Sequence, residues 1–192
     1  MDPVLGAALF GAFHGLNPAM GWLFAVFLGL QRKSQHVVLL ALAPIACGHA
    51  ASVLAVAALV VLARSTLPVG PVRVVTAALL LAFGAYKLLT LSRHPRWVGL
   101  NVGYRDLAWW SFLMATAHGS GLMLTPLLLG VANSEGTLAL LAVHSASMVV
   151  VMAVVAVAVF HRLGVVALRR YWINFDVLWV GALLLAGVLA LG

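Results

Sequence analysis

Residues 37–63 read VVLLALAPIACGHAASVLAVAALVVLA, a run without Asp, Glu, Lys or Arg. A helix needs about 20 predominantly apolar residues to cross a bilayer, so this run is long enough for one crossing. Comparable stretches follow along the 192 residues, of which 65% are hydrophobic and 8% charged. The sequence therefore predicts an integral membrane protein whose main partner is the lipid bilayer. It excludes a soluble enzyme and a nucleic-acid reader.

Polar breaks divide the chain into six predicted spans, at about 3–30, 37–63, 72–92, 107–132, 137–160 and 174–191. We expect α-helices, because backbone polar groups in lipid must be satisfied within their own segment and no span alternates like a barrel strand. The predicted fold class is all-α, a polytopic membrane protein. Residues 1–192 form a single transmembrane domain.

The charged residues predict the topology. Eleven Lys and Arg residues against four Asp and Glu residues give the net charge of +7. Only Arg64 and Arg73 fall in the even-numbered loops. The odd-numbered loops hold Arg32, Lys33, Lys87, Arg93, Arg96, Arg105, Arg162, Arg169 and Arg170. The positive-inside rule then places both termini outside, for a protein of a bacterial inner membrane. Interfacial aromatics are expected at Trp97, Trp109, Trp110, Tyr171 and Trp172.

The two halves of the chain, about 3–92 and 107–191, repeat one pattern. His14-Gly15 in the first span matches His118-Gly119 in the fourth, and a His-x-x-Ser in the second span matches one in the fifth. Three crossings per half would make the second copy inverted, an arrangement of many secondary transporters. The alternative is a chance match between Ala- and Val-rich helices.

Four histidines lie well inside the predicted spans, where an ionisable side chain is costly and usually faces a bundle interior. They are the predicted metal ligands: His14, His49, His118 and His144. Asn17, Ser52 and Ser147 follow three of them at a spacing of three residues, which on a helix shares a face, and join the predicted substrate-binding set. Alternatively, each histidine only makes its own helix-packing hydrogen bond. His36, His94 and His161 are expected at the membrane interface.

Prolines predict helix breaks. Pro18 removes a backbone donor in mid-span, so we expect a break over His14-Gly-Leu-Asn-Pro18. Pro44 and Pro126 predict weaker breaks in the second and fourth spans, and the alternative at each proline is an ordinary kink in a continuous helix. Transporters use such discontinuous helices to expose backbone groups to a substrate.

The ligand could be a transition metal, with copper, nickel and iron as candidates, or haem b. The only acids, Asp2, Asp106, Glu135 and Asp176, lie near span ends, so no mid-membrane carboxylate offsets a divalent ion. Methionines four residues from His118 and His144, together with Cys47, would suit Cu(I). A porphyrin dianion would neutralise Fe(II) between two histidines. The single cysteine excludes an internal disulfide.

The motifs His14-Gly-Leu-Asn-Pro18 and Gly48-His49-Ala50, with six helices in a 3+3 layout, resemble the lysine-exporter superfamily in its broad sense. The nearest branches are the nickel-cobalt exporter and urease-accessory membrane proteins. The resemblance implies a small transporter of a metal ion or other solute. The metal-exporting branch carries an acidic residue shortly after the first histidine. This chain has Ala19 and Met20 there, which argues against nickel or cobalt.

The leading hypothesis is thus a secondary transporter with a histidine-lined site between inverted halves, so that transport is favoured over catalysis. The alternatives are a bis-histidine haem subunit for electron transfer and a histidine-metal membrane enzyme. A bundle of six short helices would also suit a homodimer or a larger membrane complex.

Overall fold

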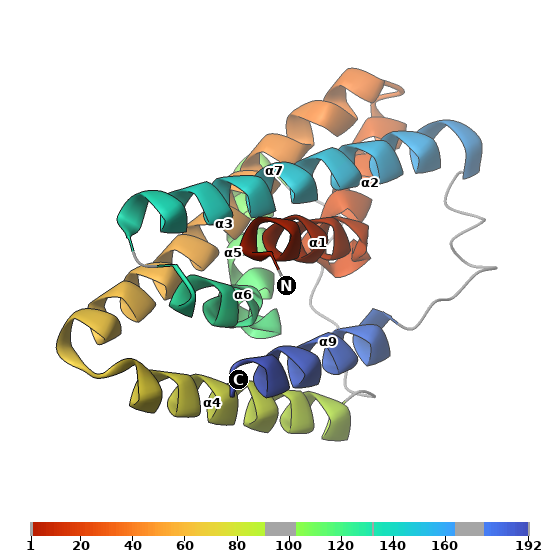
Figure 1. Ribbon diagram of the computed structural model, residues 1–192. Helices are drawn as coiled ribbons and strands as arrows, with labels where there is room; N and C mark the ends of the chain where they lie inside the picture. Colours follow the sequence, from red (N-terminus) through yellow and green to blue (C-terminus); the bar gives the residue numbers. More distant parts are fainter. Residues whose placement is uncertain (1, 91–102, 132, 164–174, 192) are drawn as a thin grey trace.

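The computed structural model describes residues 2–90, 103–131, 133–163 and 175–191. Within these ranges the chain is helical and contains no strand, which confirms the all-α prediction. The first half contains α1 (Pro3–Leu16), a 3₁₀ turn (Pro18–Met20), α2 (Trp22–Gln31), α3 (Gln35–Thr66) and α4 (Val69–Leu89). The second contains α5 (Tyr104–His118), α6 (Ser120–Leu129), α7 (Ser134–Ala158), a π turn (Val159–Leu163) and α9 (Phe175–Leu189) (Figure 1).

Several helices are suited to a membrane. By length and composition, α3, α4 and the continuous segment Ser134–Arg162 can each cross a bilayer. Helices α5 and α6 provide a fourth crossing if the pair, bent by 60°, counts as one span. Helices α1, α2 and α9 are apolar but shorter. The described residues thus support an integral membrane protein with three or four such crossings.

The predicted first span is two helices rather than one. Helix α1 ends at Leu16, and Asn17 adopts an extended backbone (φ −71°, ψ 117°) while its Oδ1 accepts from the Ala19 amide at 3.0 Å. Gly21, at φ 115°, starts α2 in the left-handed region that favours glycine. The break at Pro18 is confirmed. The expectation that Asn17 shares a helix face with His14 is wrong, because the helix has already ended.

The break in the fourth span lies at Gly119, not at Pro126. Gly119 has φ 70° and ends α5, whereas Pro126 lies inside α6 and Pro44 inside α3. A proline in a membrane helix removes one hydrogen bond, and neighbouring groups can compensate for that loss. A left-handed residue redirects the backbone itself. The predicted breaks at Pro44 and Pro126 are therefore wrong.

The short first helix of each half packs on the long helix of the other half. Helix α1 lies along α7 and α5 lies along α3, while α4 and α9 form a separate pair (Figure 1). Glycines allow the first two contacts to be close. A Cβ at Gly11 would overlap the His144 carbonyl, and a Cβ at Gly48 would overlap the Ala108 carbonyl. This packing brings histidines from both halves into the same interior.

Candidate metal centre

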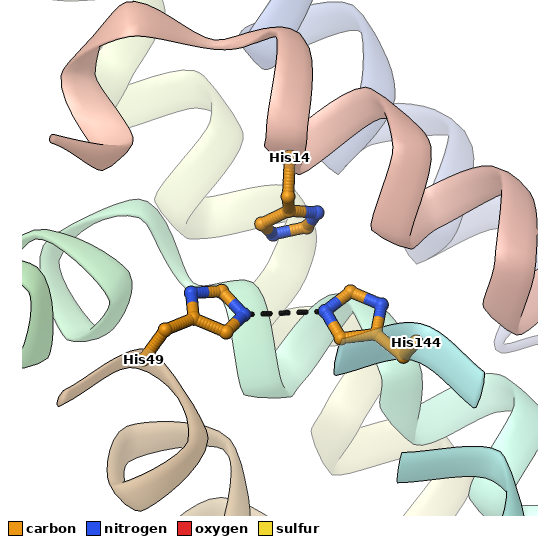
Figure 2. A group of neighbouring side chains, drawn as sticks. All are labelled: His14, His49 and His144. Carbon is orange, nitrogen blue, oxygen red and sulfur yellow. Dashed lines mark hydrogen bonds between the residues drawn. The ribbon is translucent and has the colours of Figure 1, made fainter. Parts of the chain in front are cut away.

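Three histidines converge in the interior: His14 from α1, His49 from α3 and His144 from α7 (Figure 2). Each is 0% exposed, and one ligand nitrogen from each lies within 4.8 Å of the others. The ring centroid of His14 lies 5.3 Å from that of His49 and 4.9 Å from that of His144. In the described parts of the chain, this is the only such group of three His, Cys, Asp or Glu side chains.

The orientation of His14 leaves one nitrogen available. Its Nδ1 lies 2.6 Å from the Phe10 carbonyl oxygen, which can only accept, so Nδ1 carries the proton. In a neutral imidazole the lone pair is then on Nε2, and this buried atom has no hydrogen-bond partner. A backbone carbonyl that fixes the tautomer in this way is the usual outer partner of a metal-binding histidine.

His49 and His144 meet through their Nε2 atoms, which lie 3.2 Å apart and share one hydrogen bond (Figure 2). Two nitrogens that bind one tetrahedral ion at about 2.0–2.1 Å are themselves about 3.4 Å apart. The observed separation is therefore close to that of two ligands on one ion. The Nδ1 of His49 is also buried without a hydrogen-bond partner.

His118 lies beside this group but does not join it. Its Nδ1 donates to the Met114 carbonyl at 2.8 Å, as the Nδ1 of His14 does to Phe10. The Trp179 ring from α9 packs edge-on against both His118 (5.1 Å) and His14 (4.7 Å). The structure thus brings together three of the four predicted metal ligands. His118 is at the end of α5, where the backbone turns away at Gly119.

The other predicted site residues connect helices. The Ser52 hydroxyl hydrogen-bonds to the Thr116 hydroxyl at 2.9 Å, and the Ser147 hydroxyl donates to the Ala8 carbonyl at 2.8 Å. Asn17 caps the 3₁₀ turn. Each serine therefore joins the long helix of one half to the first helix of the other. All three hold the helices that carry the histidines.

The centre is formed by neutral donors. The described acids, Asp2, Asp106 and Glu135, are exposed at helix starts, and Cys47 is exposed too. The side chain of Asp176 lies outside the described residues. Three imidazoles without a carboxylate can bind a cation, but they do not neutralise it.

The remaining loop residues are only partly described. His36 and His161 are exposed, and the Nε2 of His161 lies 2.6 Å from the Gln35 Oε1. A set of predicted loop and interface residues lies outside the described ranges: Arg93, His94, Arg96, Trp97, Arg169, Arg170, Tyr171 and Trp172.

Two tryptophans were missed by reasoning from the sequence. The indole of Trp22 donates to the Leu16 carbonyl at 3.3 Å, and that of Trp179 donates to the His118 carbonyl at 2.8 Å. Each carbonyl belongs to the last residue of a helix that ends at a break. Trp22 lies well inside a predicted span, and its N–H needs a partner there, which is a signal that the sequence did contain.

Comparison with known proteins found no matching family model, no matching curated protein and no matching solved structure. The resemblance to the lysine-exporter superfamily therefore stays a prediction from short motifs. The function must follow from the three-histidine centre and the helices that hold it.

Proposed function

We propose that this protein is a small secondary transporter in which His14, His49 and His144 bind a transition-metal ion during its passage across the membrane. The observation that carries the proposal is the convergence of three fully buried histidines from three helices. The lone pair of one of them has no partner. Such a set has the donors of a metal site and lies in the interior of an apolar bundle.

Helix packing alone is a poor explanation of the centre. A buried polar atom without a hydrogen bond costs about 1–3 kcal/mol, and His14 Nε2 is in this state. A histidine that served only packing would be expected to use its second nitrogen as well. Binding a metal ion would satisfy the His14 Nε2 lone pair, which the protein leaves open.

The arrangement of the halves supports the transporter class. Each half begins with a helix that breaks at or soon after its His-Gly, and continues with a long helix that carries a His-x-x-Ser. His14 and His49 come from the first half and His144 from the second, so the centre lies between halves. We therefore include in the proposal a 3+3 inverted repeat with halves of about 3–92 and 107–191.

Topology and family form the rest of the proposal. We propose six spans from the polar breaks along the chain, and both termini outside in a bacterial inner membrane from the loop charge. Membership of the lysine-exporter superfamily follows from the motifs around His14 and His49. Both would agree with transport rather than catalysis.

Haem and enzyme functions have less support. A porphyrin would have to lie between its two axial nitrogens, yet the Nε2 atoms of His49 and His144 hydrogen-bond directly at 3.2 Å. A hydrolytic metal centre commonly adds a carboxylate or another base. Among the described side chains, the group around His14 contains no such residue.

The test is metal uptake by proteoliposomes that contain the purified protein, measured for a panel of first-row transition-metal ions. The variant is His144→Gln, which keeps an amide near the position of Nε2, and the control is His36→Gln at an exposed position. We expect the wild type and His36→Gln to transport at least one ion, and His144→Gln to be at least tenfold slower. Equal rates in all three proteins, or no transport of any ion by folded protein, would refute the proposal.

A further inference from the structure

The three ligands of the centre are uncharged, and this favours an ion of low charge. This step rests on the proposed function, since it concerns which metal the three histidines bind. The ligands are neutral imidazoles, and the three described acids are exposed at helix starts. The cost of moving an ion from water into a low-dielectric interior rises with the square of its charge, so a divalent ion costs about four times as much as a monovalent one. A monovalent ion is favoured.

The three nitrogens leave one position of a tetrahedral ion open. His14, His49 and His144 supply three donors, a set that also suits Zn²⁺ with water as the fourth ligand, whereas Ni²⁺ prefers square-planar or larger coordination. Copper likewise accepts imidazole, and soft thioethers select Cu(I). The fourth donor therefore decides between zinc and copper.

A methionine lies one helical turn from the centre. Met148 follows His144 by four residues on α7, so the two share a helix face, and Met148 is 0% exposed. Side chains on a helix lean toward its N-terminus, which directs Met148 toward the turn of His144. Helix α1 also packs closely here, because a Cβ at Gly15, the residue after His14, would lie 2.5 Å from the Met148 carbonyl oxygen.

From these features we infer that the transported ion is Cu(I) and that the Met148 thioether is its fourth, soft donor. Thioethers select Cu(I) over divalent ions. Met152 is a matched control. It is equally buried and on the same helix, but eight residues from His144, or about 12 Å along the axis. That distance is too long for a ligand of the same ion.

The experiment uses the full chain in lipid nanodiscs under anaerobic, reducing conditions, with Cu(I), Zn(II) and Ni(II) as separate probes. A chromophoric Cu(I) chelator provides the competition. We expect one Cu(I) per chain, bound at least 100-fold more tightly than Zn(II) or Ni(II). Met148→Leu should weaken Cu(I) binding at least tenfold and change Zn(II) binding by less than twofold. Met152→Leu should change neither.

The outcomes separate this inference from the proposed function. Tighter binding of Zn(II) or Ni(II), lost in His144→Gln, would overturn the Cu(I) assignment and leave a metal transporter. Equal effects of Met148→Leu and Met152→Leu would overturn the role of Met148. Failure to bind any metal would overturn the proposed function itself. If Met148→Leu does not fold, X-ray absorption of the Cu(I)-loaded wild type decides, since a sulfur ligand is expected and its absence excludes Met148.

Discussion

The hydrogen bond from His14 Nδ1 to the Phe10 carbonyl gives the two ring nitrogens of this side chain different roles. Nδ1 orients the ring, and Nε2 is left for a ligand. Asparagine places its amide nitrogen near the position of a histidine Nδ1 but has nothing at Nε2. A substitution can therefore keep the first role and remove the second.

We predict that His14→Asn retains the fold but no longer responds to metal. A ligand that binds only the folded state at 100 times its dissociation constant adds about 2.7 kcal/mol of stability. The wild type should show this gain in thermal unfolding with added metal, because it binds the ion. His14→Asn should show none, since the metal-binding nitrogen is gone.

The control for this prediction is His36→Asn, at an exposed histidine. It should gain stability with metal to the same extent as the wild type. A His14→Asn protein that is stabilised as much as this control would show that His14 is not a ligand.

At the scale of elements, each broken helix has a tryptophan that caps it. Leu16 and His118 end α1 and α5, and their carbonyls accept from Trp22 and Trp179. Carbonyls at a helix end lack an intrahelical partner, and in an apolar bundle no bulk water replaces it. The indole N–H groups thus stabilise the breaks that position the histidines.

We predict that Trp179→Phe destabilises the protein by about 1–3 kcal/mol, the cost of a buried acceptor without its partner. Phenylalanine keeps an aromatic ring beside Phe13 and His14 but cannot donate to the His118 carbonyl. Chemical or thermal unfolding in one detergent would measure the loss. Trp109→Phe, at a side chain that is 56% exposed, should stay within about 0.5 kcal/mol of the wild type. Equal losses in the two variants would contradict this capping role.

The contact between α1 and α7 gives another prediction. A Cβ at Gly11 would overlap the His144 backbone, so Gly11→Ala must push the helices apart. We expect a loss of about 1–3 kcal/mol in stability, as for other overpacked interiors, and weaker metal binding because His144 moves with α7. Gly181→Ala is the control, since no atom lies within 4 Å of its added Cβ. If both variants bind metal like the wild type, the close contact does not position His144.

The helix breaks show which elements the sequence could predict. Pro18 was a reliable signal because it combines a missing donor with an Asn before it that can cap the next turn. Gly119 was not a reliable signal of a helix break, because a glycine in a membrane helix more often marks close packing, as Gly11 and Gly48 do here. Whether a glycine has a left-handed φ depends on tertiary packing that the local sequence does not encode.

At the scale of the whole molecule, the sequence predicted which histidines are candidate ligands, but not which of them converge in the interior. His14, His49 and His144 were identified because each is an ionisable group within an apolar span. His118 satisfied the same criterion, yet it lies on α5 beside Trp179 and outside the group of three. Spacing along a chain can assign a residue to a helix face. Which faces converge depends on how α1, α3, α5 and α7 cross, and that is a property of the assembled bundle.

The predicted topology can be tested with single cysteines in a Cys47→Ser background. Loop charge places Gln31 in the cytoplasm and Ser65 and Ser134 outside, and all three are exposed. In intact cells, a membrane-impermeant maleimide should label Ser65→Cys and Ser134→Cys but not Gln31→Cys. Permeabilised cells, in which all three should react, are the control. The reverse labelling pattern would show that the protein has the opposite orientation in the membrane. A mixed pattern would contradict the six-span topology.

The most direct test of the three-histidine centre is the metal content of the purified chain in nanodiscs after loading and dialysis, with four proteins compared. We expect one ion per chain in the wild type and in His118→Asn, and none in His14→Asn or His49→Gln. A wild type that bound no metal, or a His118→Asn protein that lost the ion as completely as the two variants within the centre, would contradict a three-histidine centre.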